Sequence, residues 1–334
     1  MKSITVSIIL PFHGRCDFLD EAIESIIQQS FTDWELILVE NQADAHTVKK
    51  VEDYLSKDLR IRLLHEPTKG ISCALNTGLE AAQGKYIARL DADDIAHPTR
   101  LEKQFRYLEN HPQCGLVSCQ TTLFPASSSN EGYQLFVDWQ KEIISHQEHA
   151  ENIFIESPIA HPSVMFRNSL IKQYGNYSTD HIPEDYELWL RWMSHGVKFY
   201  KLPEELLLWR DRPDRLSRTH SAYDTLAFDR VKVHYLAKYL KNLDLHHRPI
   251  IVCGTGKNSL RRAKMLEDQG IPIYAHTDVK QKTNKVPFLS VRECLNLDNA
   301  FFINFISERN VKKQVAAWLE QQGKNIMTDY ILAG

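Results

Sequence analysis

Short apolar runs alternate with amphipathic segments along the first hundred residues of this chain. The apolar runs have the length of buried strands and lie at residues 5–10, 35–39, 61–64 and 85–90. The segments between them space their apolar side chains as a helix does, at residues 18–29, 47–55 and 71–82. Strand–helix alternation of this kind predicts an α/β fold with a parallel sheet that helices cover on both faces.

The pattern becomes less regular from about residue 114 onward. Apolar runs near residues 115–121 and 163–167 predict two more strands, and residues 138–152 predict one helix. Residues 184–193 predict another helix, because Pro183 precedes them and acidic residues occupy the first turn, where the helix dipole favours negative charge.

A second, smaller α/β unit follows a long helical stretch at residues 222–241. Polar residues 242–248 mark a boundary, and beyond them the pattern predicts strands at 249–253, 271–275 and 300–304 and helices at 259–269 and 308–322. A chain of 334 residues is long enough for two cores. We therefore expect a first domain at residues 1–220, a helical connector at 221–247 and a second domain at 248–334.

Charge and composition restrict the class of partner. The net charge of −3 gives no reason to expect nucleic acid or an anionic membrane as the main partner. No apolar run approaches the roughly 18 residues of a transmembrane helix. The six cysteines are scattered without a Cys-x-x-Cys pair, which favours reduced thiols. We expect a cytoplasmic protein and leave open a peripheral contact with the inner face of the membrane.

Three carboxylates follow the apolar run at residues 85–90, at Asp91, Asp93 and Asp94. Like charges this close repel one another and cannot be buried cheaply without a partner. A hard divalent cation with oxygen ligands, Mg²⁺ or Mn²⁺, resolves this conflict and can also bind a diphosphate. The alternative is a solvated turn before the helical stretch that begins near Pro98.

The carboxyl ends of parallel strands meet at one edge of a sheet, where ligands of α/β proteins bind. Pro11 and Glu40 each directly follow a predicted strand, and the aspartates follow a third. We therefore expect these residues to converge on one crevice.

Six segments, in this order along the chain, match the motifs of one enzyme family. They read Val6-Ser-Ile-Ile-Leu-Pro-Phe-His13, Trp34-Glu-Leu-Ile-Leu-Val-Glu40, Lys69-Gly-Ile-Ser-Cys-Ala-Leu-Asn-Thr-Gly78, Gly84-Lys-Tyr-Ile-Ala-Arg-Leu-Asp-Ala-Asp-Asp94, His161-Pro-Ser-Val-Met-Phe-Arg167 and Pro183-Glu-Asp-Tyr-Glu-Leu-Trp-Leu-Arg191. Over roughly residues 4–220 the chain thus resembles the family 2 glycosyltransferases.

The resemblance implies a GT-A fold and a metal-dependent, inverting transfer of a sugar from a nucleotide-diphosphate donor. The implied acceptor is a hydroxyl of a glycan or glycolipid, in the synthesis of surface polysaccharide or lipopolysaccharide. One segment departs from the family pattern, because the second strand usually ends in paired Asp residues and here ends in Glu40-Asn-Gln-Ala43. Glu40 can still accept a hydrogen bond from a base N–H, so uridine stays the favoured base.

The resemblance also implies roles for single residues. Asp185 matches the family's catalytic base, with Glu184 beside it, although both could simply stabilise a helix dipole. Asp93 is the first choice for metal contact, and Asp91 could bind the metal or a ribose hydroxyl, while Asp94 could orient the loop. The expected donor-binding residues are Pro11, His13, Glu40, Lys69, Asp91, Arg210 and Arg218; for Lys69, an ordinary exposed loop position is the alternative.

The expected acceptor-side residues are His161 and Trp189. His161 could line the acceptor site or cap a strand, and Trp189 could stack on a sugar or belong to the core, as aromatic residues at helical spacing usually do.

Gly254-Thr-Gly256-Lys-Asn-Ser259 follows the first strand of the second unit and approaches a dinucleotide-binding fingerprint. Ser259 stands where the third glycine belongs. The unit resembles small Rossmann-like domains, and we favour a structural, acceptor-positioning or oligomerisation role over nucleotide binding.

Two other functions remain as alternatives. A sugar-nucleotide pyrophosphorylase shares a nucleotide-binding α/β fold, but Pro11-Phe-His-Gly-Arg15 supplies only one Gly and one Arg to the loop that this class needs. A nucleotide-responsive scaffold that uses Gly254 and Gly256 is the non-enzymatic alternative.

Overall fold

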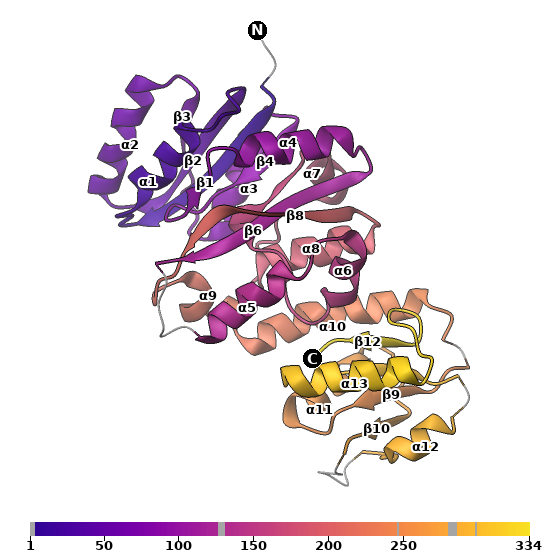
Figure 1. The fold of residues 1–334 in the computed structure, drawn as a ribbon. Coiled ribbons are helices and arrows are strands. Elements are labelled where there is room, and N and C mark those ends of the chain that lie inside the picture. Colours follow the sequence, from indigo (N-terminus) through magenta and orange to yellow (C-terminus); the bar gives the residue numbers. More distant parts are fainter. Residues whose placement is uncertain (1–3, 126–130, 246, 280–285, 298) are drawn as a thin grey trace. The chain divides into compact units, whose positions relative to one another are not determined.

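The computed structural model describes residues 4–125, 131–245, 247–279, 286–297 and 299–334 (Figure 1). These residues form two units, Met1–His146 with Pro158–Tyr223 and Gln147–Ser157 with Asp224–Gly334. In the described part of the chain, no helix is both long enough and apolar enough to cross a membrane.

An eight-stranded sheet forms the centre of the first unit, in the order β3-β2-β1-β4-β7-β6-β8-β5. The strands are β1 (Val6–Gly14), β2 (Trp34–Ala43), β3 (Ile61–His65), β4 (Tyr86–Arg89), β5 (Ile95–Ala96), β6 (Cys114–Phe124), β7 (Met165–Arg167) and β8 (Lys198–Arg210). The first four in spatial order run parallel, as the alternation predicts. β7 is antiparallel to both of its neighbours, so the complete sheet is mixed.

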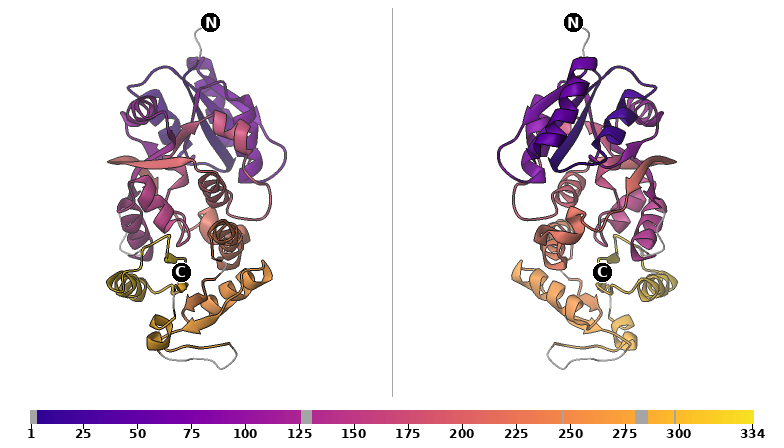
Figure 2. Two further views of the ribbon diagram at one scale, coloured as in Figure 1. Left: turned by 90° about the vertical axis from the view of Figure 1, so that its right-hand side faces the viewer. Right: turned by 90° about the vertical axis from the view of Figure 1, so that its left-hand side faces the viewer.

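Helices cover both faces of the parallel strands, as the side views of Figure 2 show. These helices are α1 (Leu19–Ile27), α2 (Ala45–Lys57), α3 (Ile71–Ala81) and α4 (Arg100–Asn110). Ile8 and Leu36 share one core with apolar residues of α1, α2 and α4. Gly78 of α3 lies against Ile9 and Val39, which point the other way because side chains alternate along a strand. The expected α/β fold is confirmed.

The remaining helices of the first unit lie toward the antiparallel half of the sheet (Figure 1). They are α5 (Glu131–Lys141), η2 (His161–Ser163), α7 (Ser169–Tyr174), α8 (Glu184–Ser194), α9 (Leu216–Thr219) and η3 (Ser221–Tyr223). Almost all of α6 (His146–Asn152) belongs to the second unit.

The prediction of a single helix at residues 138–152 was wrong, because the chain forms α5 and α6 with a break between them. In the break, the Ile144 carbonyl accepts a hydrogen bond from the Lys201 backbone N–H of β8 at 2.9 Å. The Lys201 ammonium also donates to the carbonyl of Gln140. Bonding to a strand thus replaces the continuation of the helix.

Strand β8 was not expected from the sequence, although its 13 residues pair with both β6 and β5. Pro203 and two glutamates interrupt its apolar pattern. The pairing with β6 shifts register between Cys119 and Thr121, so the extra residues are accommodated as a local irregularity. β8 ends at Arg210, and its partner β5 begins directly after Asp94.

A four-stranded, fully parallel sheet forms the centre of the second unit, in the order β10-β9-β11-β12. Its elements are α10 (Thr225–Asn242), β9 (Ile250–Cys253), α11 (Lys257–Asp268), β10 (Ala275–Thr277), α12 (Val291–Leu295), β11 (Phe301–Asn304), α13 (Arg309–Gln321) and β12 (Tyr330–Leu332). This sheet fits a second α/β domain. The domain limits at residues 220 and 248, and the Rossmann-like character of this unit, stay predictions.

The strand expected at residues 271–275 lies later, at Ala275–Thr277. Pro272 has no backbone N–H for a ladder, and the chain reaches the sheet only where Tyr274 N–H donates to the Ile250 carbonyl at 2.9 Å.

Candidate active site

Three carboxylates gather in the turn between β4 and β5. Each of Asp91, Asp93 and Asp94 offers an oxygen, and these oxygens lie within 4.8 Å of one another. Asp94 is buried, and the other two are half-buried. Burial, followed by the charge of Asp91, raises the pKa values of Asp93 and Asp94, and for Asp94 the rise is large.

Arg89, the last residue of β4, is the buried partner of this cluster. Its guanidinium forms an ion pair with Asp91 and is 4% exposed. Burial lowers the pKa of Arg89, but the charge and hydrogen bond of Asp91 outweigh it, so the pKa is raised and the side chain stays charged. The buried guanidinium of Arg89 therefore supplies a fixed positive charge next to the acidic cluster.

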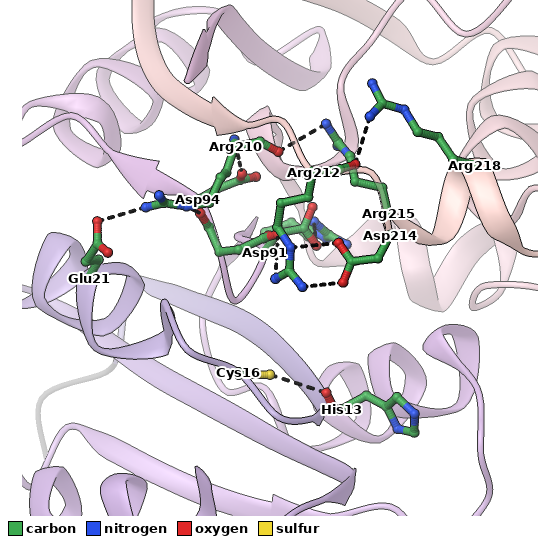
Figure 3. Close-up of polar contacts among 12 residues, drawn as sticks. His13, Cys16, Glu21, Asp91, Asp94, Arg210, Arg212, Asp214, Arg215 and Arg218 are labelled. Atoms are coloured by element: carbon green, nitrogen blue, oxygen red, sulfur yellow. Dashed lines mark hydrogen bonds and ion pairs between the residues drawn. The ribbon is translucent and has the colours of Figure 1, made fainter. Parts of the chain in front are cut away.

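Arg210, at the end of β8, holds the acidic turn from the other side (Figure 3). Its backbone N–H donates to Asp94 Oδ1 at 2.8 Å, and its Nε donates to the Asp93 carbonyl at 2.7 Å. Its Nη2 donates to Glu21 Oε2 of α1 at 2.8 Å, and the guanidinium lies over the Phe18 ring. Arg210 is an expected donor-binding residue, and in this structure its contacts fix the shape of the acidic loop.

The segment after β8 brings further arginines to the same place (Figure 3). Arg212 pairs with Asp214 at 2.5 Å and approaches Asp93 at 3.6 Å. Arg215 donates to the Arg210 carbonyl at 3.3 Å and lies over the Trp209 ring. The segment surrounds the carboxylates with positive charge.

Arg218, an expected donor-binding residue, lies farther along this segment and is exposed. It forms an ion pair with Asp211 at 2.7 Å and donates to the Arg212 carbonyl at 2.8 Å. These contacts tie the segment to itself.

The ends of β1 and β2 lie side by side, as predicted, because Phe12 pairs with Glu40 in the parallel ladder. Pro11 is buried within β1, and the exposed His13 ring binds the Asn41 carbonyl. Figure 3 shows His13, near the end of β1, and Cys16, on the loop that follows; the charges of Asp93 and Arg212 both act on the Cys16 thiol. This loop therefore faces the acidic cluster.

The segment that departs from the family pattern is tied down inside the protein. Glu40 accepts hydrogen bonds from His65 and from the Ala43 backbone. Asn41 donates to the Glu66 and Thr68 carbonyls at 2.8 and 2.9 Å and accepts from the Gly70 N–H at 2.9 Å. These bonds shape the loop that carries the exposed Lys69.

Helix α8 presents the expected base at its first turn. Asp185 is half-buried, and its Oδ1 accepts the Tyr186 N–H at 2.7 Å. Burial raises the pKa of Asp185, and this backbone bond and the charge of Arg89 act against the rise. Burial and then the charge of Asp185 also raise the pKa of Glu184, whose Oε2 accepts the Tyr223 hydroxyl at 2.5 Å.

His161 and Trp189 lie behind this turn. Burial lowers the pKa of His161 well below its ordinary value, so the ring is neutral; it contacts the Tyr177 hydroxyl at 2.8 Å and lies 3.7 Å from Glu184. Trp189 is 0% exposed and packs against His161 and Trp192. Its ring has no open face for a sugar in this structure, which agrees with the alternative interpretation that it belongs to the core.

The acidic cluster and the α8 carboxylates belong to one electrostatic site. The charges of Arg89 and Asp91 both act on Asp185, and that of Arg89 also acts on Glu184 and His161. The sequence singled out the five carboxylates of this site, but it did not single out Arg89, Arg212, Arg215 and Tyr223. An Arg inside the apolar run Tyr86-Ile-Ala-Arg-Leu90 was the available signal, because a buried charge needs a partner.

The Gly254 loop of the second unit satisfies its own donors. Asp278, which follows β10, accepts hydrogen bonds from the Thr255 N–H at 3.0 Å and from its hydroxyl at 2.8 Å. Gly254 has φ of 113°, and a Cβ there would meet the Ser259 hydroxyl at 2.6 Å. A carboxylate of the chain thus occupies donors that a nucleotide phosphate would use.

The acidic cluster has the donor set that a divalent cation requires. Its oxygens converge, and the buried Asp94 Oδ2 accepts no hydrogen bond from the described residues. Carboxylate oxygens without soft ligands suit Mg²⁺ and Mn²⁺. These residues therefore fit such an ion.

The sequence of this chain is similar to the sequences of glycosyltransferases. The family model described as Glycosyl transferase family 2 matches residues 7–175. The O-antigen biosynthesis glycosyltransferase WbnJ of Escherichia coli is 28% identical over 222 residues, which are 65% of this chain and 84% of WbnJ.

Solved structures show the same fold at low sequence identity. The crystal structure of S. aureus TarS 1-349 in complex with UDP-GlcNAc has a TM-score of 0.57 and 16% identity, over 79% of this chain and 71% of TarS. The mannosyltransferase PcManGT from Pyrobaculum calidifontis, in complex with GDP-Man and Mn²⁺, has a TM-score of 0.53 and 17% identity, over 79% and 68% of the two chains. The predicted GT-A fold is confirmed.

Replacement of Asp91 and replacement of Asp93 should change the free energy of unfolding by different amounts. Asp91→Asn leaves the buried Arg89 guanidinium uncompensated, so we expect it to lower the free energy of unfolding by about 3 kcal/mol. Asp93→Asn removes a partner of the more exposed Arg212 and should change this free energy by no more than about 1 kcal/mol. Urea unfolding without divalent ions measures both values; equal losses would contradict the role of Arg89.

Proposed function

The chain belongs to glycosyltransferase family 2, and from this premise we propose an inverting transfer of sugar from a UDP-sugar to a hydroxyl of a glycan or glycolipid. The observation that carries the proposal is the joint placement of the acidic cluster and Asp185 around the buried Arg89. A single displacement needs groups that stabilise the charge of the departing diphosphate and a base that takes the proton of the acceptor hydroxyl.

Asp93 and Asp91 would hold Mg²⁺ or Mn²⁺, and Asp94 would complete or orient the set. The ion supplies charge neutralisation to the departing diphosphate. Arg210 acts on the donor through the loop that it fixes, while Arg212, Arg215 and Lys69 present cationic groups to phosphate oxygens. The structures of TarS in complex with UDP-GlcNAc and of PcManGT in complex with GDP-Man support a donor of this class.

Pro11, His13 and Glu40 border the place where the nucleoside would lie. Glu40 accepts from His65 in the structure, so an incoming base N–H would have to share or replace that bond. Arg218 would act by holding the segment that carries Arg212.

Asp185 would take the proton of the acceptor hydroxyl. The acceptor oxygen then bonds to the anomeric carbon as the bond from that carbon to the diphosphate oxygen breaks. Glu184, fixed by Tyr223 and close to His161, positions the first turn of α8 beneath this base. The name of WbnJ supports an acceptor that belongs to a surface polysaccharide.

For the second unit we propose a structural or acceptor-positioning role. The internal bonds from Thr255 to Asp278 support it over nucleotide binding.

A panel of nucleotide sugars tests the donor and the metal together. We expect release of UDP from a UDP-sugar in the presence of Mn²⁺ or Mg²⁺, its loss with EDTA and its return when the ion is restored. GDP release from a GDP-sugar instead would refute the choice of base. Pyrophosphate release from a nucleoside triphosphate and a sugar 1-phosphate would favour the pyrophosphorylase alternative.

Replacing the proposed base should affect the transition state and not donor binding. Asp185→Asn keeps the size of the side chain but removes the proton acceptor, so we expect kcat to fall by about 10²–10⁴-fold. The dissociation constant of UDP should change by less than about twofold, which calorimetry measures. Activity within a factor of about three of the wild type would remove Asp185 from this role.

The activity should depend on pH in the direction set by the site. The carboxyl works as a base only when deprotonated, and burial raises the pKa of Asp185. We expect kcat/KM to rise with pH on an acid limb whose midpoint lies above the ordinary Asp value of about 4. Because Asp185 and Glu184 interact, this midpoint belongs to the pair. Constant activity down to pH values near about 4 would contradict the assignment.

A further inference from the structure

Arg212 has two carboxylate neighbours, Asp93 and Asp214, and Figure 3 shows its contact with Asp214. Its Nε and one terminal nitrogen bind the two oxygens of Asp214 at 2.9 and 2.5 Å. Its other terminal nitrogen lies 3.6 Å from Asp93 Oδ2. The side chain of Arg212 is 31% exposed and that of Asp214 is 64% exposed. Arg212 thus supplies Asp93 with a close counter-ion that remains accessible to solvent.

The other two carboxylates of the cluster have partners that cannot move easily. Asp91 pairs with Arg89, whose side chain is 5% exposed, and Asp94 accepts the backbone N–H of Arg210. The contact between Arg212 and Asp93 differs from both, because it is longer than a hydrogen bond and involves an exposed side chain. It is the ion pair that can be exchanged at low cost.

The neighbouring arginines are held in place more firmly. The Arg210 side chain is 7% exposed and binds Glu21. The Cζ atom of Arg215 lies 4.3 Å from the centroid of the Trp209 ring. Arg212 therefore combines a long contact with Asp93 and a partly exposed guanidinium whose bidentate partner, Asp214, lies two residues away on the same segment.

We propose that Arg212 is an exchangeable counter-ion, which neutralises Asp93 in the nucleotide-free enzyme and moves to the donor diphosphate when a divalent cation binds Asp93. This inference rests on the proposed function and adds the order in which Arg212 contacts Asp93 and then the diphosphate. A divalent ion and a guanidinium cannot both stay close to Asp93 without repulsion, whereas a diphosphate offers Arg212 a new bidentate partner.

The exchange predicts effects of opposite sign for one substitution. In Arg212→Gln the competing charge is gone, so Mn²⁺ should bind the nucleotide-free protein about three- to thirty-fold more tightly. With Mn²⁺ saturating, UDP should bind about tenfold more weakly, because a charged contact to phosphate is lost. A purely structural role would weaken both. The free-ion EPR signal measures Mn²⁺ binding, and calorimetry measures UDP binding.

Two variants serve as controls. Arg106→Gln changes the net charge equally but lies on α4, where Arg106 pairs with Glu102, so Mn²⁺ affinity should not change. Arg212→Lys retains the charge and should keep the wild-type Mn²⁺ affinity, which also shows that the segment tolerates substitution.

Unchanged or weaker Mn²⁺ binding by Arg212→Gln overturns the exchange, as does equal tightening in Arg106→Gln. If the wild-type protein binds no Mn²⁺ with or without UDP, the metal site of the proposed function fails and the exchange fails with it. Normal Mn²⁺ binding without tightening in Arg212→Gln overturns the exchange alone.

Discussion

Crowding of negative charge at the end of β4 is the constraint to which the rest of the first unit responds. Three carboxylates whose oxygens converge within 4.8 Å repel one another, and one of them is buried. The fold offsets this repulsion with three different devices: the guanidinium of Arg89, the backbone N–H of Arg210 and the exposed Arg212.

These devices come from parts of the chain that are far apart in sequence. Arg89 belongs to the parallel half of the sheet, whereas Arg210 ends a strand in the mixed half, and its side chain also reaches Glu21 of α1. Because the charge of Arg89 also acts on Asp185, one buried side chain acts on both the acidic cluster and the first turn of α8. A family 2 glycosyltransferase thus obtains its polar site from a core that is otherwise strongly apolar.

The parts predicted best are those in which neighbouring residues carry the information. The alternation of apolar and amphipathic segments located β1 to β4 and the helices between them, and the first turn of α8 was readable from Pro183 and its acidic residues. The parts predicted poorly depend on distant partners. The break between α5 and α6 needs the Lys201 N–H of β8, and Trp189 could be placed in the core only once its neighbours were known.

The sequence by itself determined the α/β class and the family and singled out the candidate site residues, because periodicity and motifs are local properties of the chain. Only the tertiary structure decided how those residues are neutralised. Arg210 proved to hold the acidic loop, and Arg89 proved to be the buried counter-charge. Charge compensation acts through space, so it depends on strand order and burial, and no pattern of neighbouring residues records it.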